Sequence, residues 1–337
     1  MHNEPIRLPW AASDWFENAS AWIEGQLQSH GWHITAPIEL IHQRPWSSFA
    51  RIVTDNGVAY FKAPAPMFSY EAGLAQALAS WRPDCSVPLL GIDLERGWIL
   101  SADAGITLRQ VTRSVDQIPH WLHVMPLYAE LQIELIDRVP ELLALGLPDR
   151  RLEQLPQLYA QVLEDTETLR IGLEDGLTPE EYQRLRDGQA HFAAQCEQLA
   201  AYKLPATLTH EEVHENNVLL GDGRYIFTDW SDCSVGHPFF TMLVTLRAAA
   251  HWLQLDESGP ELRQVRDAYL EPWTRFAPHE DLLQALALAY RLGMVNRALS
   301  WHHGLSRLSE HDKAEYADSV PGWLQDYLQA EAGEQQA

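Results

Sequence analysis

The chain has 337 residues, of which 46% are hydrophobic and 21% are charged, and its formal net charge is −23. This length predicts two domains or two lobes, and this composition excludes a disordered chain. The negative charge would repel a polyphosphate backbone, so we expect no nucleic-acid partner. Three scattered cysteines make neither a disulfide framework nor a zinc site, which suits a reducing cytoplasm. No uncharged apolar run is long enough to span a membrane.

The first hundred residues predict a helix and a small antiparallel sheet. Asn56-Gly57 separates two strand-like runs, which is a strong signal for a tight hairpin. The expected elements are helices at 14–29 and 71–81, strands at 39–44, 49–54 and 58–63, and two further strands in VPLLGIDL and GWILSAD. Together they predict a small α+β lobe that ends near residue 104.

After Gly105 the chain is expected to be mainly helical. Helical periodicity covers 118–137, 150–171, 179–201, 239–254, 260–275, 279–304 and 312–329. Only one sheet-like piece, at 217–228, is expected to interrupt these helices. The predicted fold class is therefore α+β, with a small antiparallel-sheet N-lobe (1–104) and a large, mainly helical C-lobe (105–337).

The segment LTHEEVHENNVLLGDGRYIFTDW, residues 208–230, carries the chemistry. Its residues 210–214 match H-E-x-x-H, which binds zinc when both histidines lie one turn apart on a helix. The context argues against a helix, because a proline and β-branched residues precede the motif and a strand-like run with a Gly-Asp-Gly turn follows it. We therefore expect these five residues in a loop that leads into a β-hairpin.

A kinase catalytic loop explains the same segment better than a zinc site. Phosphoryl transfer needs a carboxylate that orients the acceptor hydroxyl, and oxygen ligands for the Mg²⁺ that bridges the phosphates. Glu212, Asn217 and Asp229 supply a carboxylate, an amide oxygen and a second carboxylate. The hairpin is expected to fold the last of these groups back beside the first two.

This segment resembles the aminoglycoside phosphotransferase and choline kinase-like family, whose text is close to H-G-D-L-H-P-G-N-V-L, a short hairpin and I-D-W. The matching residues are His210, Glu212, Val213, His214, Asn217, Val218, Leu219, Thr228, Asp229 and Trp230. The resemblance implies a bilobal protein kinase-like fold that uses ATP and Mg²⁺, a shape that the small sheet lobe and large helical lobe also suggest.

The same resemblance implies a role for each matching residue. Asn217 and Asp229 would bind Mg²⁺, and Glu212 stands in the place of the catalytic aspartate. His214 takes the place of a lysine of protein kinases, so it is a candidate contact to the γ-phosphate or else a hydrogen-bonded core histidine. His210 would brace the loop rather than take part in the chemistry.

Two departures from the family pattern bear on activity. Glu212 is one methylene longer than aspartate, and a misplacement of about 1 Å can cost about a hundredfold in rate. His237 and Thr241 stand where the family has two aspartates, the later of which helps to hold the catalytic loop. The alternative to an active kinase is therefore a nucleotide-binding pseudokinase with a regulatory role.

The nucleotide end of the site is expected in the N-lobe. Lys62 ends a strand and would hold the phosphates, with Glu71 of the next helix as its partner, although a surface lysine and a helix-terminal glutamate give the same pattern. No glycine-rich loop precedes Lys62, and the turn before the second strand offers Ser47 and Ser48 to a phosphate. By resemblance alone, the backbone of Leu100, Ser101 and Ala102 would bind the adenine edge.

The sequence thus predicts a small-molecule kinase with ATP and Mg²⁺ as cofactors. The N-lobe would bind the nucleotide, and the C-lobe would carry the catalytic loop, the metal site and the acceptor site. An acidic groove would suit a cationic acceptor such as an aminoglycoside or an amino alcohol, but the acidic charge also serves solubility. Sugars, homoserine-like acceptors and the oligomeric state stay open.

Overall fold

The computed structural model describes residues 5–111 and 114–334. The chain divides into two compact units. The first comprises Met1–Gln110, Asn216–Ser231 and Arg307–Lys313, and the second comprises Val111–Glu215, Asp232–Ser306 and Ala314–Ala337. Each unit is therefore assembled from three separate stretches of chain. The roles predicted for residues 1–104 and 105–337 stay predictions.

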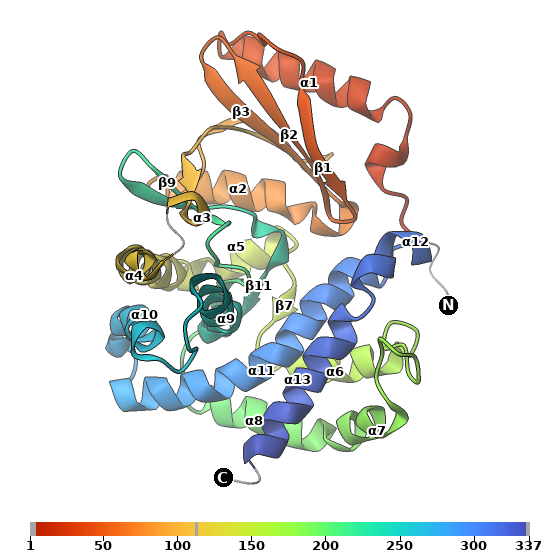
Figure 1. The fold of residues 1–337 in the computed structure, drawn as a ribbon, viewed down its shortest axis with the longest axis vertical. Helices are drawn as coiled ribbons and strands as arrows, with labels where there is room; N and C mark the ends of the chain where they lie inside the picture. Colours follow the sequence, from red (N-terminus) through yellow and green to blue (C-terminus); the bar gives the residue numbers. More distant parts are fainter. Residues whose placement is uncertain (1–4, 112–113, 335–337) are drawn as a thin grey trace. The chain divides into compact units, whose positions relative to one another are not determined.

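The first unit contains an antiparallel five-stranded sheet in the order β1-β2-β3-β5-β4. Its strands are β1 (Glu39–Arg44), β2 (Ser47–Thr54), β3 (Gly57–Pro64), β4 (Leu89–Asp93) and β5 (Trp98–Ala102). Helix α1 (Trp15–Ser29) lies along one face of this sheet (Figure 1), and α2 (Tyr70–Trp81) packs against β4 and β5. The helices and strands predicted for this part of the chain are confirmed.

The alternation of side chains along the strands gives the sheet a core face and an open face. Ile52 of β2 and Phe61 of β3 are buried in one cluster with Ile23 of α1. Tyr60 and Lys62, on either side of Phe61, line a cavity instead. Because side chains alternate along β3, the register that buries Phe61 also directs the side chain of Lys62 into the cavity.

The predicted hairpin at 217–228 is confirmed, and it joins a second sheet. This sheet has the order β10-β9-β6, with β6 (Ile106–Thr107), β9 (Val218–Gly221) and β10 (Arg224–Phe227). The turn residues Asp222 and Gly223 both have positive φ, as a tight hairpin turn requires. Gly105 has φ +116°, and a Cβ atom there would lie 2.3 Å from the Leu220 carbonyl oxygen. Only glycine fits this close approach, which holds the hairpin against the segment that follows β5.

The second unit is mainly helical, as predicted. Its longer helices are α4 (Ile118–Glu134), α5 (Val139–Ala144), α6 (Leu155–Glu164), α7 (Pro179–Asp187), α8 (Gln189–Ala200), α9 (Thr241–Leu253), α10 (Pro260–Leu270), α11 (His279–Leu305) and α13 (Ser319–Glu334). Helix α11 packs against α6, α8, α9 and α13, and lies beside α13 in Figure 1. Because α11 is buried on several sides, it forms the centre of this unit's core. Across the described ranges, every helix is too short or too polar to cross a bilayer.

A third sheet corrects one expectation. Its strands β7 (Asp149–Arg150), β8 (Thr207–His210) and β11 (Cys233–Gly236) lie in the second unit in the order β7-β11-β8. The expectation that a single sheet-like piece interrupts the helices is therefore wrong. These strands are short and pair with partners far away in the chain, so no local periodicity indicates them.

The predicted helix over 150–171 is wrong at both ends. Arg150 belongs to β7, and α6 begins only at Leu155, with a proline in its first turn. After α6 ends, the Asp165 carboxylate accepts hydrogen bonds from the backbone and hydroxyl of Thr168. The single helix predicted over 179–201 divides into α7 and α8 at Gly188, a residue type that weakens helices.

Candidate active site

A cavity of about 620 Å³ lies in the first unit. It is lined by the open face of the five-stranded sheet, α2, the segment after β5 and the ends of the β9–β10 hairpin. The predicted nucleotide- and metal-binding residues that line it are Ser47, Lys62, Glu71, Ser101, Ala102, Asn217 and Asp229. The fold therefore brings together residues that are up to 182 positions apart, from Ser47 to Asp229.

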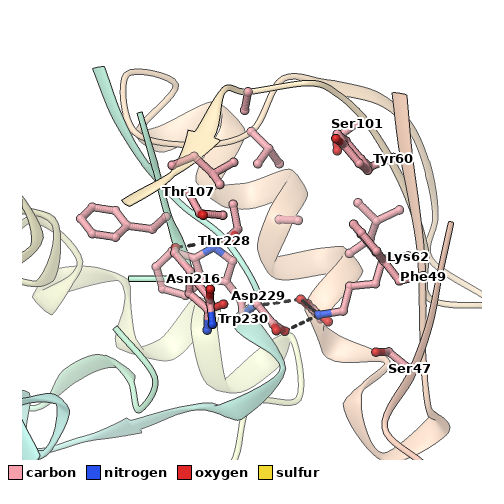
Figure 2. A pocket seen from close by; sticks show the side chains of 18 of the residues that line it. Ser47, Phe49, Tyr60, Lys62, Ser101, Thr107, Asn216, Thr228, Asp229 and Trp230 are labelled. Carbon is pink, nitrogen blue, oxygen red and sulfur yellow. Dashed lines mark hydrogen bonds and ion pairs between the residues drawn. The ribbon is translucent and has the colours of Figure 1, made fainter. Parts of the chain in front are cut away.

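Lys62 makes two ion pairs at the wall of this cavity. Its Nζ lies 2.6 Å from Oε1 of Glu71 and 2.5 Å from Oδ1 of Asp229. Figure 2 shows the side chains of Lys62 and Asp229 pointing toward one another. The Glu71 Oε1 also accepts a hydrogen bond of 2.9 Å from the Trp230 backbone N–H. Oδ1 of Asp229 accepts one of 2.9 Å from the Ser231 hydroxyl. Glu71 thus ties helix α2 to the end of the hairpin as well as to the lysine.

The charges of this cluster support one another. Burial alone would lower the pKa of the Lys62 ammonium, but the carboxylates of Asp229 and Glu71 outweigh it and raise that pKa. Burial raises the pKa of the Glu71 carboxyl, and the Lys62 ammonium opposes this. Lys62 therefore stays a fixed cation at the cavity wall, which suits the binding of an anionic group.

Asn217 and Asp229 lie at the two ends of the hairpin. The Thr228 N–H donates a 3.0 Å hydrogen bond to the Asn217 carbonyl oxygen, which brings the two ends together. Asp229 has φ +62°, a left-handed backbone that is uncommon outside glycine, asparagine and aspartate. Such backbones cluster at functional sites.

The donor set at the hairpin ends fits Mg²⁺. One amide oxygen and one carboxylate, both on the cavity wall, are hard oxygen ligands of the kind that Mg²⁺ takes together with phosphates and water. Within residues 5–111 and 114–334, no three His, Cys, Asp or Glu side chains gather as a metal site of their own. A divalent cation held here by Asn217 and Asp229 would complete its coordination with oxygen atoms of phosphates and water.

Two residues predicted at the nucleotide end face away from the cavity. Ser48 is fully buried, and its Oγ has no hydrogen-bond partner. Leu100 is fully buried in the cluster beneath α1. Ser47, Ser101 and Ala102 do line the cavity, so the alternation of the two strands separates each pair of neighbours.

The aromatic part of the cavity wall was not predicted from the sequence. Phe49 of β2 and Tyr60 of β3 are stacked, with ring centroids 5.6 Å apart and planes inclined by 7°. Arg44 of β1 also lines the cavity. The alternation in both strands was the signal that could have identified them, since Phe49 precedes core residue Ala50 and Tyr60 precedes core residue Phe61.

The predicted catalytic segment lies in the second unit. His210 ends strand β8, and residues 211–217 form turns rather than a helix. The helix that H-E-x-x-H needs for zinc is therefore not formed. Glu212 and His214 are both partly exposed, with side-chain exposures of 26% and 20%. Oε2 of Glu212 lies 4.0 Å from Nε2 of His214.

His210 holds the start of this loop from three sides. Its backbone N–H donates a 2.8 Å hydrogen bond to the Tyr128 hydroxyl, and its carbonyl oxygen accepts one of 2.5 Å from the Thr241 hydroxyl. Its ring Nδ1 accepts one of 3.2 Å from the backbone N–H of Glu212. Thr241, which stands where the family pattern has an aspartate, thus contacts the loop through a hydroxyl.

The two adjacent glutamates have separate partners. Glu211 is buried, and its Oε1 lies 2.8 Å from an Arg150 guanidinium nitrogen, while its Oε2 accepts a 2.5 Å hydrogen bond from Ser300. Oε1 of Glu212 instead contacts the guanidinium of Arg297. The two neighbouring side chains therefore bind different parts of the second unit.

Arg297 and Asp232 are further residues that the sequence analysis missed. Arg297 lies in α11, is 4% exposed, and places a guanidinium nitrogen 3.3 Å from Oδ2 of Asp232. Arg297 is 85 residues away from Glu212 in the chain, and nothing in its local sequence marks it. Only the packing of α11 under the loop reveals it.

Comparisons with known proteins bear on the family and the fold of this chain. Residues 145–280 match the model of the APH phosphotransferase enzyme family. No curated protein sequence resembles the chain closely enough to count as a match.

Solved structures share the fold over most of the chain. The choline kinase LicA from Streptococcus pneumoniae is 11% identical with a TM-score of 0.62, over 94% of this chain and 99% of that one. An ethanolamine kinase from Plasmodium vivax is 13% identical with a TM-score of 0.60, over 90% and 84%. A type I macrolide 2′-phosphotransferase is 12% identical with a TM-score of 0.55, over 90% and 97%.

This chain has an antiparallel sheet followed by a mostly helical remainder, and its fold matches these kinases over most of its length, so the predicted fold class is confirmed. The residues that match the family model include the segment that carries Glu212, Asn217 and Asp229. The chain resembles the aminoglycoside phosphotransferase and choline kinase-like family, through the family match over residues 145–280 and through a protein kinase-like fold.

Proposed function

We propose that this protein is an ATP-dependent phosphotransferase that moves the γ-phosphoryl group to a hydroxyl of a small molecule in the cytoplasm. The observation that carries the proposal is the pairing of Lys62 with both Glu71 and Asp229 at the wall of a 620 Å³ cavity. A buried cation flanked by a helix carboxylate and a hairpin carboxylate is the arrangement that kinase-type sites use to hold phosphates.

The nucleotide would lie in the cavity of the first unit. Lys62 would neutralise the phosphates, Ser47 would contact them, and the base would lie near Ser101 and Ala102 on the aromatic wall. Asn217 and Asp229 would hold Mg²⁺, which neutralises charge on the phosphates when it is bound. Ser48 and Leu100 would not contact the nucleotide directly, because their side chains are buried and their strands pair with a neighbour on each side.

The acceptor chemistry would belong to the second unit. Glu212 would orient the acceptor hydroxyl and His214 would contact the transferred group. The hydroxyl oxygen forms the new bond to the γ-phosphorus, and the bond from that phosphorus to the β–γ bridging oxygen breaks, with its electron pair leaving on ADP. The hydroxyl proton passes to the Glu212 carboxylate and from there to water.

The family match and the fold support a small-molecule phosphotransferase in general. Proteins of this fold carry names of choline, ethanolamine, macrolide and spectinomycin enzymes, and one is solved with ADP and spectinomycin. Together with the net charge of −23, this favours a cationic or polyhydroxylated acceptor over nucleic acid. Cys85, Cys196 and Cys233 are buried and form no disulfide in the described part of the chain, which is consistent with a reducing compartment.

Thermal shift and turnover assays test the proposal together. Mg-ATP should raise the melting temperature, ATP with EDTA should do so less, and Asp229→Ala should remove the difference while the fold is kept. A panel of amino alcohols, aminoglycosides, macrolides and sugars should then reveal one class that releases ADP. Unchanged Mg-dependent stabilisation of Asp229→Ala would overturn the metal assignment.

A nucleotide-binding pseudokinase is the second candidate, because a glutamate replaces the usual aspartate and is engaged by Arg297. Stabilisation by Mg-ATP without release of ADP or phosphate, with any acceptor or with water, would favour this role over the enzyme.

A further inference from the structure

Arg297 occupies an unusual place beneath the catalytic segment of the second unit. Its side chain is 5% exposed, whereas the two carboxylates that it contacts, Glu212 and Asp232, are 26% and 25% exposed. On another side, the Trp301 ring lies under the guanidinium, 5.4 Å from it. A buried cation therefore supports two carboxylates that both reach the surface.

The environment of Arg297 keeps it charged. Burial disfavours the charge, but the carboxylates of Glu212 and Asp232 outweigh burial and raise the pKa of the guanidinium. The buried Glu211 carboxylate adds to this effect. Charged or titratable groups beside these carboxylates include Arg150, which pairs with Glu211, and His214, whose Nε2 is 4.0 Å from Oε2 of Glu212.

A contribution to folding stability does not by itself explain why residue 297 is an arginine. Nε and one terminal nitrogen of its guanidinium are buried without a hydrogen-bond partner, although that nitrogen is 3.3 Å from Asp232 Oδ2. Apolar residues of similar size often stabilise such a position as well as, or better than, a buried ion pair does. What an arginine supplies, and an apolar residue cannot, is a fixed position for the carboxylate of Glu212.

We propose that Arg297 is a positioning residue for Glu212. It binds Oε1 and thereby presents Oε2, on the side of His214, to the acceptor hydroxyl. The contact restrains the additional side-chain torsion that distinguishes glutamate from aspartate, so the longer carboxylate is held in one orientation. This inference rests on the proposed phosphotransferase function and assigns a task to a residue outside the sequence motif.

Helix α11 gives this contact its rigidity. Ser300, one turn after Arg297, bonds to Oε2 of the neighbouring Glu211. Two side chains of a helix at the centre of the core thus hold two successive residues of the loop. The orientation of Glu212 is therefore set by an element that is itself fixed by packing.

The experiment uses the full-length protein and water as the acceptor, with release of phosphate from Mg-ATP as the readout. Variants are Arg297→Met, Arg297→Lys, Glu212→Gln and the double variant Arg297→Met/Glu212→Gln. Arg247→Met is the matched control, because Arg247 is also part-buried in the second unit, pairs with Asp326 and lies over the Trp323 ring. Melting temperatures and the KM for ATP are measured for every variant.

We expect Arg297→Met to lower kcat by about a hundredfold with little change in the KM for ATP, since misplacement by about 1 Å has an effect of this size. Arg297→Lys should recover part of the loss, and Arg247→Met should keep the rate. In the Glu212→Gln background, Arg297→Met should lower kcat little further, because the carboxylate that Arg297 positions is already absent. The acidic limb of the kcat–pH profile of Arg297→Met should move to higher pH, since a carboxylate without its cation takes up a proton more readily.

Multiplicative losses in the double variant, or an unchanged pH profile with a melting temperature lowered as in Arg247→Met, would show a purely structural role and overturn the proposal. If Arg297→Met does not fold, the same comparisons are made with Arg297→Lys. A wild-type protein that binds Mg-ATP and releases neither ADP nor phosphate, with water or with any acceptor of the panel, would overturn the proposed function, and the positioning role with it. An active wild type whose Arg297 variants keep its kcat would overturn the positioning role alone.

Discussion

Lys62 and Glu71 form a buried ion pair, so the loss of either partner is expected to destabilise the folded protein. The Glu71 side chain is 3% exposed and depends on the ammonium for compensation of its charge. Removing one member of such a pair typically costs about 3–5 kcal/mol, because the remaining charge stays buried.

Lys62→Met should therefore lower the free energy of unfolding by about 3–5 kcal/mol, and Lys62→Met/Glu71→Gln should restore more than half of it. Urea unfolding at pH 7 measures both values. Equal stability of the single and double variants would contradict the pairing as described. Neither variant should show stabilisation by Mg-ATP comparable to the wild type.

His237 predicts a pH dependence of stability. It is buried, its Nδ1 accepts a hydrogen bond from the Phe239 N–H, and burial lowers its pKa to about 3. In the unfolded chain its pKa is about 6.5. Between these values the unfolded chain binds a proton that the folded chain does not, so stability is lost as pH falls below about 6.5.

His237→Asn keeps an acceptor for the Phe239 N–H and does not titrate in this range. The wild type should lose about 2 kcal/mol more than this variant between pH 7 and pH 5. Urea unfolding at the two pH values gives the difference. Identical losses in the two proteins would mean that His237 does not stay neutral in the folded state.

At the scale of elements, the segment after β5 and the β9–β10 hairpin depend on one close contact. A Cβ on Gly105 would lie 2.3 Å from a carbonyl oxygen of β9, and the residue has a positive φ that other residues rarely adopt. The position of Asn217 and Asp229 follows from how this hairpin is seated.

Gly105→Ala should destabilise the protein by more than about 2 kcal/mol and weaken Mg-ATP binding, since both sterics and backbone strain oppose the change. Gly25→Ala is the control, because that glycine lies within α1 with open space around its Cβ position. The control should gain about 0.5–1 kcal/mol. Thermal unfolding and calorimetric titration with Mg-ATP compare the two, and a Gly105→Ala variant with the stability and Mg-ATP affinity of the wild type would contradict the close approach.

At the scale of the whole molecule, the first unit is not a continuous piece of chain. Asn216–Ser231 belongs to it although more than a hundred residues of the second unit come between. A fragment that ends at residue 110 has Lys62 and Glu71 but neither Asn217 nor Asp229, and its β6 has no partner strand.

Residues 1–110 expressed alone should therefore show no Mg-dependent stabilisation by ATP. The full chain under the same conditions is the control. Thermal shift with Mg-ATP and with ATP plus EDTA measures the difference. A fragment that responds to Mg-ATP as the full chain does would show that the hairpin carboxylate and amide are dispensable.

Local sequence patterns were sufficient to predict the parts of the structure that form between residues close together in the chain. The hairpin, the alternation around Lys62 and the five strands of the first sheet all follow from neighbouring residues, and their positions could be predicted. Arg297 and strands β7, β8 and β11 could not, because each acquires its partner only through long-range packing. The open face of the sheet could be predicted in part. Alternation indicates that Tyr60 lies on the face opposite to Phe61, but it does not indicate that Phe49 stacks on Tyr60.

The central position of α11 has a consequence for how this protein tolerates change. The helix that holds Glu211 and Glu212 through Ser300 and Arg297 is the same helix against which α6, α8, α9 and α13 pack. The rotation of α11 about its own axis therefore affects both the packing of the hydrophobic interior and the positions of Glu211 and Glu212. A change of side-chain volume on α13 should therefore alter turnover through this shared helix. Measurements of kcat and the melting temperature of such a variant test this, and an unchanged kcat would contradict it.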